Sequence, residues 1–258
     1  MEIIDSHVHP PLETGRNLCW FPEWVSTASP EAFVAELREA GISRCCGAVI
    51  CKPLGVDRRD SVPEMNRAAR GFSERVGDFY VPAVQLDLTQ PEESCRELEF
   101  YYHHGFRWIG ELYQRSPDES AFLSDGAFQV YELAVTLGVP ISIHAKRLDV
   151  FPELCTNLPA LSIVLSQPMT EQTRVQECLR LVSRYRNLYW DLSADARSRP
   201  GIIEKAVAEL GSHKILFGSG FPLRRPSSAV ADYLYAGLNP SQLELIFSGN
   251  FKRLTGIE

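Results

Sequence analysis

The feature that most constrains the fold is a regular alternation of short apolar runs with amphipathic segments along the whole chain. Eight apolar runs predict β-strands at residues 2–5, 45–51, 80–86, 106–112, 140–144, 161–166, 188–192 and 214–219. Most of these runs are continuous rather than alternating, which is typical of parallel strands covered on both faces. Eight strands, each followed by a helix or a long loop, predict an α/β fold with a single (β/α)8 TIM barrel.

Helical segments separate the predicted strands. Residues 29–41 begin with Ser29 as a helix cap and Pro30 in the first turn, and they end at Gly41; residues 125–138 repeat this punctuation. Further helices are expected at 62–76, 91–104, 171–185, 201–210, 227–236 and after Pro240, while 148–159 has the weakest helical pattern. An open doubly wound sheet is the alternative, but the sequence lacks its glycine-rich first turn.

The sequence shows no internal repeat and no linker, so one domain over residues 1–258 is expected. Residues 10–28, with Trp20, Phe21 and Trp24, are predicted to form a loop over the mouth of the barrel.

Charge and composition favour a soluble cytoplasmic protein that acts on a small molecule. The 26 basic and 33 acidic residues give a net charge of −7, which argues against a broad nucleic-acid or membrane surface. No signal peptide and no membrane-spanning apolar stretch is recognisable. The seven cysteines include no C-x-x-C pair, which fits a reducing compartment. Homo-oligomer formation stays open.

Two histidines end the first predicted strand, in the sequence Asp5-Ser-His-Val-His9. Because strand side chains alternate, His7 and His9 point the same way, toward the end of the barrel where active sites form. Two imidazoles at this spacing can chelate one metal ion. The alternative is a hydrogen-bonded polar pair at a strand end.

Two further polar residues end other predicted strands. His144 ends the fifth strand, and the C-terminal ends of barrel strands converge. Glu111 ends the fourth strand, where a carboxylate could bind or bridge metal ions. Its alternative role is an ion pair with Arg107 or Arg147.

The order of these residues resembles the metal-dependent amidohydrolase superfamily, most closely its amidohydrolase-related branch of small-molecule hydrolases and non-oxidative decarboxylases. Residues 187–193 (NLYWDLS), 214–222 (KILFGSGFP) and 246–254 (IFSGNFKRL) also resemble that branch, whereas the Gly-Glu pair of strand four is similar to the TatD-type nuclease branch. The resemblance implies that His7, His9 and His144 are metal ligands, with Glu111 as a further one.

The chain departs from the family pattern at two positions, so the implied metal site is degenerate. Gln167 stands where the family usually has a histidine, and Gly220 stands where it has an aspartate that binds metal and acts as general base. Three explanations stay open. Another acid, Asp191 or Asp87, is the base of a one-metal site; or the chemistry needs no aspartate, as in a metal-assisted decarboxylation; or the barrel binds without catalysis.

Several cations follow the predicted strands and would surround the mouth: Lys52, Arg115, Lys146, Arg147, Arg224 and Arg225. In an acidic protein this grouping indicates an anionic, carboxylate-bearing substrate, for which Lys52, Lys146, Arg147, Gln167 and Arg224 are the predicted contacts. The alternative is a set of solvated loop charges. The expected function is a metal-dependent hydrolase with Asp191 and Glu111 as catalytic residues, and the alternatives are a lyase or a binding protein. Imidazole ligands suit zinc, and manganese, iron or nickel are further options.

Overall fold

The computed structural model describes residues 1–10, 29–50, 58–113, 119–166, 172–193 and 200–258. Eight parallel strands follow one another in chain order: β1 (Ile4–Asp5), β2 (Arg44–Gly47), β3 (Tyr80–Val84), β4 (Trp108–Tyr113), β5 (Ile141–His144), β6 (Ile163–Leu165), β7 (Leu188–Asp191) and β8 (Ile215–Leu216). The predicted TIM barrel is therefore confirmed.

The two ends of the sheet meet just beyond the first and last strands. A parallel bridge joins Val8 to Phe221, and the amide of Ser6 donates to the carbonyl of Phe217 at 2.9 Å. The amide of Gly220 also donates to the carbonyl of His7 at 2.9 Å. These bonds close the barrel beside the predicted His7–His9 pair.

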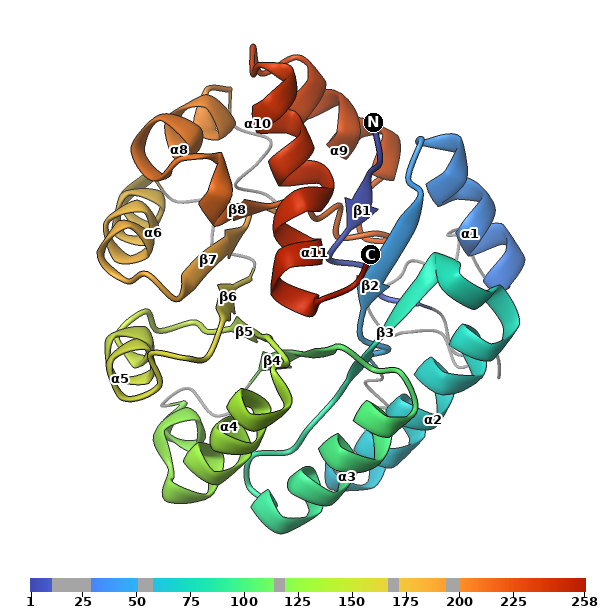
Figure 1. Cartoon of the computed structure of the whole chain (residues 1–258), viewed down its shortest axis with the longest axis vertical. Helices are drawn as coiled ribbons and strands as arrows, with labels where there is room; N and C mark the ends of the chain where they lie inside the picture. The colour runs from blue at the N-terminus through green and yellow to red at the C-terminus, as the bar shows by residue number, and fades with distance from the viewer. Residues whose placement is uncertain (11–28, 51–57, 114–118, 167–171, 194–199) are drawn as a thin grey trace.

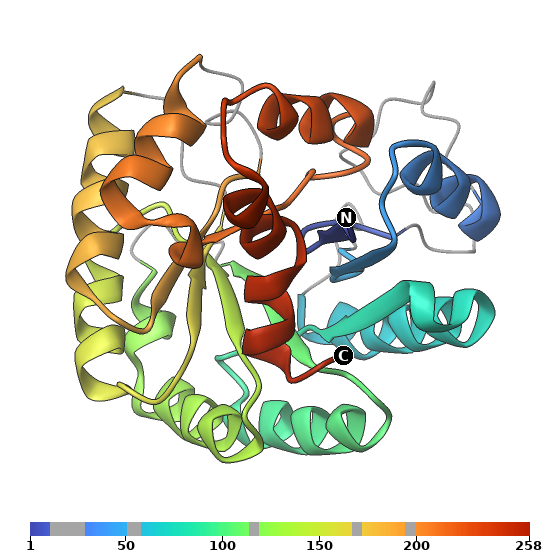
Figure 2. The same cartoon turned by 45° about the horizontal axis from the view of Figure 1, so that its top comes forward.

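The helices lie outside the strands, most of them in a ring around the barrel (Figures 1 and 2). They are α1 (Pro30–Glu39), α2 (Arg58–Val76), α3 (Pro91–His103), α4 (Asp125–Leu137), α5 (Val150–Asn157), α6 (Gln172–Arg184), α8 (Ile202–Leu210), α9 (Pro226–Leu234), α10 (Pro240–Glu244) and α11 (Asn250–Thr255). The predicted cap at Ser29 forms, since its side chain accepts an amide hydrogen bond at 3.1 Å, and Ser124, just before the second predicted segment, caps α4 in the same way at 3.2 Å. The described helices include none that is long and apolar enough to cross a membrane.

Two apolar clusters build the core. The larger lies between the strands and the helices, and the smaller contains side chains of several strands that fill the barrel interior, among them Ile4, Cys46, Val81, Ala83, Val164 and Leu216. Helix α11 lies across the barrel in Figure 1, and its Phe251 stacks on Trp108 with ring centroids 5.4 Å apart. Trp108 begins β4, so α11 closes the N-terminal end.

The structure differs from the sequence prediction mainly in strand length. The first strand covers two residues and the last covers two, against four and six predicted. His7 and His9 follow the end of β1, and the glycines around Ser219 follow the end of β8. The weakly patterned segment 148–159 does form a helix, α5, because Pro152 lies in its first turn, where no intrahelical amide donor is needed. Residues 11–28 lie outside the described residues.

Candidate metal centre

Three of the predicted ligands come together at the C-terminal end of the barrel. His7 and His9 follow β1, Glu111 lies in β4, and one ligand atom of each lies within 4.8 Å of the other two. All three side chains are buried. The convergence of strand ends, which the sequence prediction relied on, thus brings residues more than 100 positions apart into one group.

Hydrogen bonds fix the orientation of both imidazole rings. Nδ1 of His7 lies 2.5 Å from Oδ2 of Asp191, and Nδ1 of His9 lies 3.3 Å from the carbonyl oxygen of Ala48. In the neutral rings each Nδ1 is then the donor, since both partners are acceptors. The two Nε2 atoms lie 3.2 Å from each other. This arrangement fits a divalent cation held between them.

Glu111 adds a buried carboxylate to the pair. Its Oε1 lies 3.2 Å from Nδ1 of His144, and its Oε2 lies 3.9 Å from Nε2 of His7. Burial favours the neutral acid, but the charges of His7 and His144 outweigh it and lower the pKa of Glu111. A buried carboxylate beside two imidazoles is a donor set that suits a divalent metal ion.

His144 lies at the edge of this group. It ends β5, and its side chain is 33% exposed, in contrast to the three buried ligand candidates. The two oxygens of buried Glu119 accept the amide hydrogens of Lys146 and Arg147, both at 2.9 Å, and so hold the loop that follows His144. His144 reaches the group through Glu111.

The carboxylate of Asp191 contacts Nδ1 of His7, the ring nitrogen that points away from His9. Besides Nδ1 of His7, its carboxylate accepts the hydroxyl of Ser166 at 3.2 Å, the hydroxyl of Ser193 at 3.1 Å and the amide of Ser193 at 2.9 Å. A Cβ atom added to Gly218 would lie 2.3 Å from Oδ1 of Asp191. Asp191 therefore occupies the space that a side chain at this position of the barrel would need.

The buried charges shift the pKa values of the two rings in opposite directions. Burial lowers the pKa of His7, but the carboxylates of Asp191 and Glu111 outweigh it and raise the pKa to about 9. Burial, together with the charge on His7, lowers the pKa of His9 to about 4. In the metal-free protein the first ring thus carries a proton at neutral pH and the second does not.

The other predicted site residues lie elsewhere. Asp87 is buried, but its Oδ1 accepts the amide and hydroxyl of Thr89 at 3.0 and 2.7 Å, so it shapes its own loop. Lys146 and Arg147 are exposed, and Arg147 pairs with Asp149. Arg224 is half-buried and Arg225 is exposed. Lys52, Arg115 and Gln167 lie outside the described residues. Gly220 has a φ of 72°, where a glycine is favoured.

Sequence reasoning missed Gln85, Ser166, Ser193 and Glu119. Gln85 and Ser166 each directly follow an apolar strand, which is the same signal that identified His144. Glu119 has no such signal, because its carboxylate acts through backbone amides 27 and 28 positions away.

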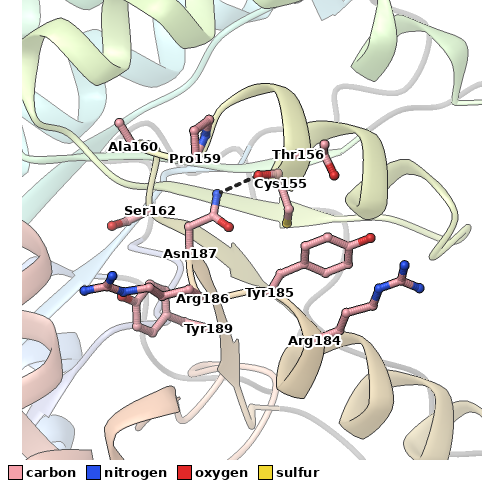
Figure 3. A pocket seen from close by; sticks show the side chains of 10 residues that line it. All are labelled: Cys155, Thr156, Pro159, Ala160, Ser162, Arg184, Tyr185, Arg186, Asn187 and Tyr189. Atoms are coloured by element: carbon pink, nitrogen blue, oxygen red, sulfur yellow. Dashed lines mark hydrogen bonds between the residues drawn. The ribbon is translucent and has the colours of Figure 1, made fainter.

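A separate cavity lies at the opposite end of the barrel, where β6 and β7 begin (Figure 3). Its volume is about 580 Å³, and it is lined by Cys155, Thr156, Pro159, Ala160, Ser162, Arg184, Tyr185, Arg186, Asn187 and Tyr189. The side-chain amide of Asn187 donates to three backbone carbonyls at 3.4, 2.9 and 3.1 Å, which fixes the wall. None of these lining residues belongs to the metal centre.

Solved structures with the same fold cover almost the whole chain. An uncharacterised TIM-barrel protein from Bordetella bronchiseptica is 18% identical over 100% of this chain and 99% of its own, with a TM-score of 0.73. A dihydroxybenzoic acid decarboxylase from Polaromonas, with bound manganese and the inhibitor 2-nitroresorcinol, is 16% identical over 99% and 97%, with a TM-score of 0.74.

A probable 2-pyrone-4,6-dicarboxylic acid hydrolase from Acinetobacter baumannii, with bound citric acid, is 17% identical over 99% and 100%, with a TM-score of 0.68. No curated protein matches the chain. The model of the family described as amidohydrolase matches residues 4–257, and the chain therefore belongs to the amidohydrolase family.

Proposed function

We propose that the protein is a metal-dependent enzyme that removes the carboxyl group of a small aromatic acid. The observation that carries this proposal is the placement of the carboxylates. The carboxylate of Glu111 lies beside the Nε2 atoms of His7 and His9, whereas the carboxylate of Asp191 contacts Nδ1 of His7. Beyond strand eight, Gly220 supplies no carboxylate where the family pattern has an aspartate, and Asp191 leaves no room for a side chain at Gly218.

This placement disfavours hydrolysis more than decarboxylation. Attack by water is helped by a positioned carboxylate base, whose loss typically costs about 10²–10⁴-fold in rate. Non-oxidative decarboxylation has no attacking water: the bond between the ring and the carboxyl carbon breaks, carbon dioxide leaves with a neutral charge, and the electron pair left on the ring takes up a proton supplied by solvent water. In this proposal Asp191 orients His7, a different role from the base that the sequence suggested.

His7, His9 and Glu111 would hold the ion, with His144 beside Glu111 as the fourth candidate ligand. A bound divalent ion would supply a Lewis acid that holds the substrate carboxylate and a neighbouring oxygen. The serine hydroxyls on Asp191 keep that carboxylate in place, and Asp191 keeps the His7 ring in one tautomer. Zinc and manganese both suit this donor set.

The comparisons support this class of substrate. The Polaromonas protein is a decarboxylase of a dihydroxybenzoic acid, and its structure holds manganese. The Acinetobacter protein supports the second candidate, hydrolysis of a carboxylate-bearing lactone, because a metal ion alone can lower the pKa of its water toward about 7.

The test uses untagged protein loaded with Mn²⁺ or Zn²⁺, incubated separately with 2,6-dihydroxybenzoate, 2-hydroxybenzoate and 2-pyrone-4,6-dicarboxylate. Chromatography and carbon dioxide release identify the products. Carbon dioxide and the decarboxylated ring, lost in His9→Ala but kept in the surface control Arg70→Gln, support the proposal. An opened lactone without carbon dioxide supports the hydrolase instead, and metal binding without turnover of any compound supports a binding protein.

A further inference from the structure

Gln85 is an inward-facing residue at the level of the metal centre. It follows β3, whose Val81 and Ala83 side chains belong to the cluster that fills the barrel interior. Since strand side chains alternate, a side chain two positions further along points inward as well, one layer nearer the C-terminal end. Its amide Nε2 donates to the carbonyl oxygen of Glu111 at 3.1 Å, which places Gln85 beside a metal-ligand candidate.

The main chain at Gln85 is held firmly. Its amide donates to Oδ1 of Asn66 at 2.7 Å, and its carbonyl accepts Nδ2 of Asn66 at 2.9 Å. Asn66 is fully buried in α2, and Nδ2 also donates to Oε2 of Glu97 at 2.9 Å. The side chain of Gln85 therefore extends from a backbone that has little freedom to move.

The oxygen of the Gln85 amide has no partner within the part of the chain that the structure describes. Its Oε1 is buried and makes no hydrogen bond there, although an amide oxygen can accept two. Reversing the amide would set Oε1 against the Glu111 carbonyl, so the bond to Glu111 determines that the oxygen is the free atom. A buried acceptor without a donor is unfavourable, and such groups mark sites where a ligand supplies the missing donor.

We infer that Gln85 is a specificity-determining residue that accepts a hydrogen bond from a hydroxyl group on the substrate held at His7, His9 and Glu111. The inference rests on the proposed function and narrows its substrate to hydroxylated aromatic acids. An acid without that hydroxyl would leave Oε1 unpaired in a closed complex, and sites built around such a bond discriminate strongly against the analogue that lacks it.

The test measures ligand binding rather than turnover. Calorimetry with manganese-loaded protein compares 2-hydroxybenzoate with benzoate, in the wild type, in Gln85→Met, which keeps the length but has no acceptor oxygen, and in the exposed control Arg70→Gln. We expect the wild type and the control to prefer 2-hydroxybenzoate by about tenfold or more. Gln85→Met should lose that preference while its affinity for benzoate stays within about twofold.

A purely structural role for Gln85 predicts a different pattern. If Gln85 only supports Glu111, Gln85→Met weakens manganese itself and both ligands equally, which overturns the inference. Absence of a wild-type preference, or failure of both ligands to bind, also overturns it. Should Gln85→Met fail to fold, Gln85→Glu retains an acceptor oxygen and must keep the preference. A preference for the hydroxylated acid without any decarboxylation supports this inference and refutes the proposed function. Decarboxylation without that preference supports the proposed function and refutes this inference.

Discussion

The two ends of the barrel treat buried polar groups in opposite ways. At the N-terminal end, Nζ of Lys214 donates to three backbone carbonyls at 2.7, 2.9 and 2.8 Å, and the amide of Asn187 donates to three more. At the C-terminal end, Oε1 of Gln85 and Oδ2 of Asp5 are buried without a donor among the described residues.

The difference separates stability from function. A buried donor that makes all its hydrogen bonds within the protein stabilises the fold and needs no ligand to complete them. Buried acceptors without donors destabilise the protein on its own, and a ligand that donates hydrogen bonds to them offsets that cost. Changes at the N-terminal end should therefore alter unfolding, and changes at the C-terminal end should alter binding.

The largest effect is expected from removing an imidazole of the metal centre. His9→Ala takes away one of two converging Nε2 ligands, so the affinity for Mn²⁺ or Zn²⁺ should fall by more than about 100-fold. Elemental analysis and competition with a chelator measure it. His103→Ala, at an exposed helix end, is the matched control and should bind metal normally. Equal metal content in both variants would refute the centre.

The opposite end gives the converse result. Lys214→Met removes the donor of three carbonyls, and the free energy of unfolding should fall by about 3 kcal/mol, because those oxygens stay buried without a partner. Urea unfolding measures the loss. Metal affinity of the folded variant should stay within about twofold of the wild type, since the carbonyls that Lys214 contacts belong to none of the three ligand candidates. A large loss of affinity would show that the ends are not independent.

The sequence predicted the barrel and the convergence of the three central ligand candidates because both depend on local patterns. Apolar runs define the strands, and His7, His9 and Glu111 follow from the rule that strand ends converge. The role of Asp191 depends on which ring nitrogen of His7 its carboxylate contacts. The two residues are 184 positions apart in the chain, so no local sequence pattern predicts that contact. The close approach of Asp191 to Gly218 is equally invisible, because it arises from two strands packed side by side.

The role proposed for Asp191 gives a smaller effect on binding. Asp191→Asn keeps the size of the side chain but loses the charge that supports His7, and loss of such a partner typically lowers metal affinity by about 10–100-fold. Asp87→Asn is the control, since it changes another buried carboxyl at a strand end that bonds its own loop. Similar losses in both variants would argue for general loosening rather than orientation of His7.

The pH dependence of metal binding tests the contact between Asp191 and His7 without a substitution. In the metal-free protein the pKa of His7 is raised to about 9, so an ion that binds at Nε2 near pH 7 must displace a proton. Affinity should rise by about tenfold per pH unit toward pH 9 and level off above it. In Asp191→Asn the plateau should begin at lower pH. Titrations by calorimetry in buffers of different ionisation enthalpy count the proton, and a pH-independent affinity would contradict this account.

The smallest effect is expected at the rim of the mouth, where two neighbouring cations differ in their partners. Arg147 is exposed and its guanidinium pairs with Asp149, whose pKa this contact lowers. Exposed ion pairs contribute little, so Arg147→Gln should change the unfolding free energy by less than about 0.5 kcal/mol and leave KM within about twofold.

Lys146 is also exposed, but within the described part of the chain its ammonium group has no ion-pair partner, and it lies two residues beyond His144. If the rim attracts a carboxylate, Lys146→Gln should raise KM severalfold with kcat unchanged, because a rim charge acts on encounter more than on the bound state. The effect should shrink as salt rises, since screening weakens exposed charges first. Equal KM values for the two variants would show that these cations serve solvation alone, and that recognition of an anionic substrate rests entirely within the barrel.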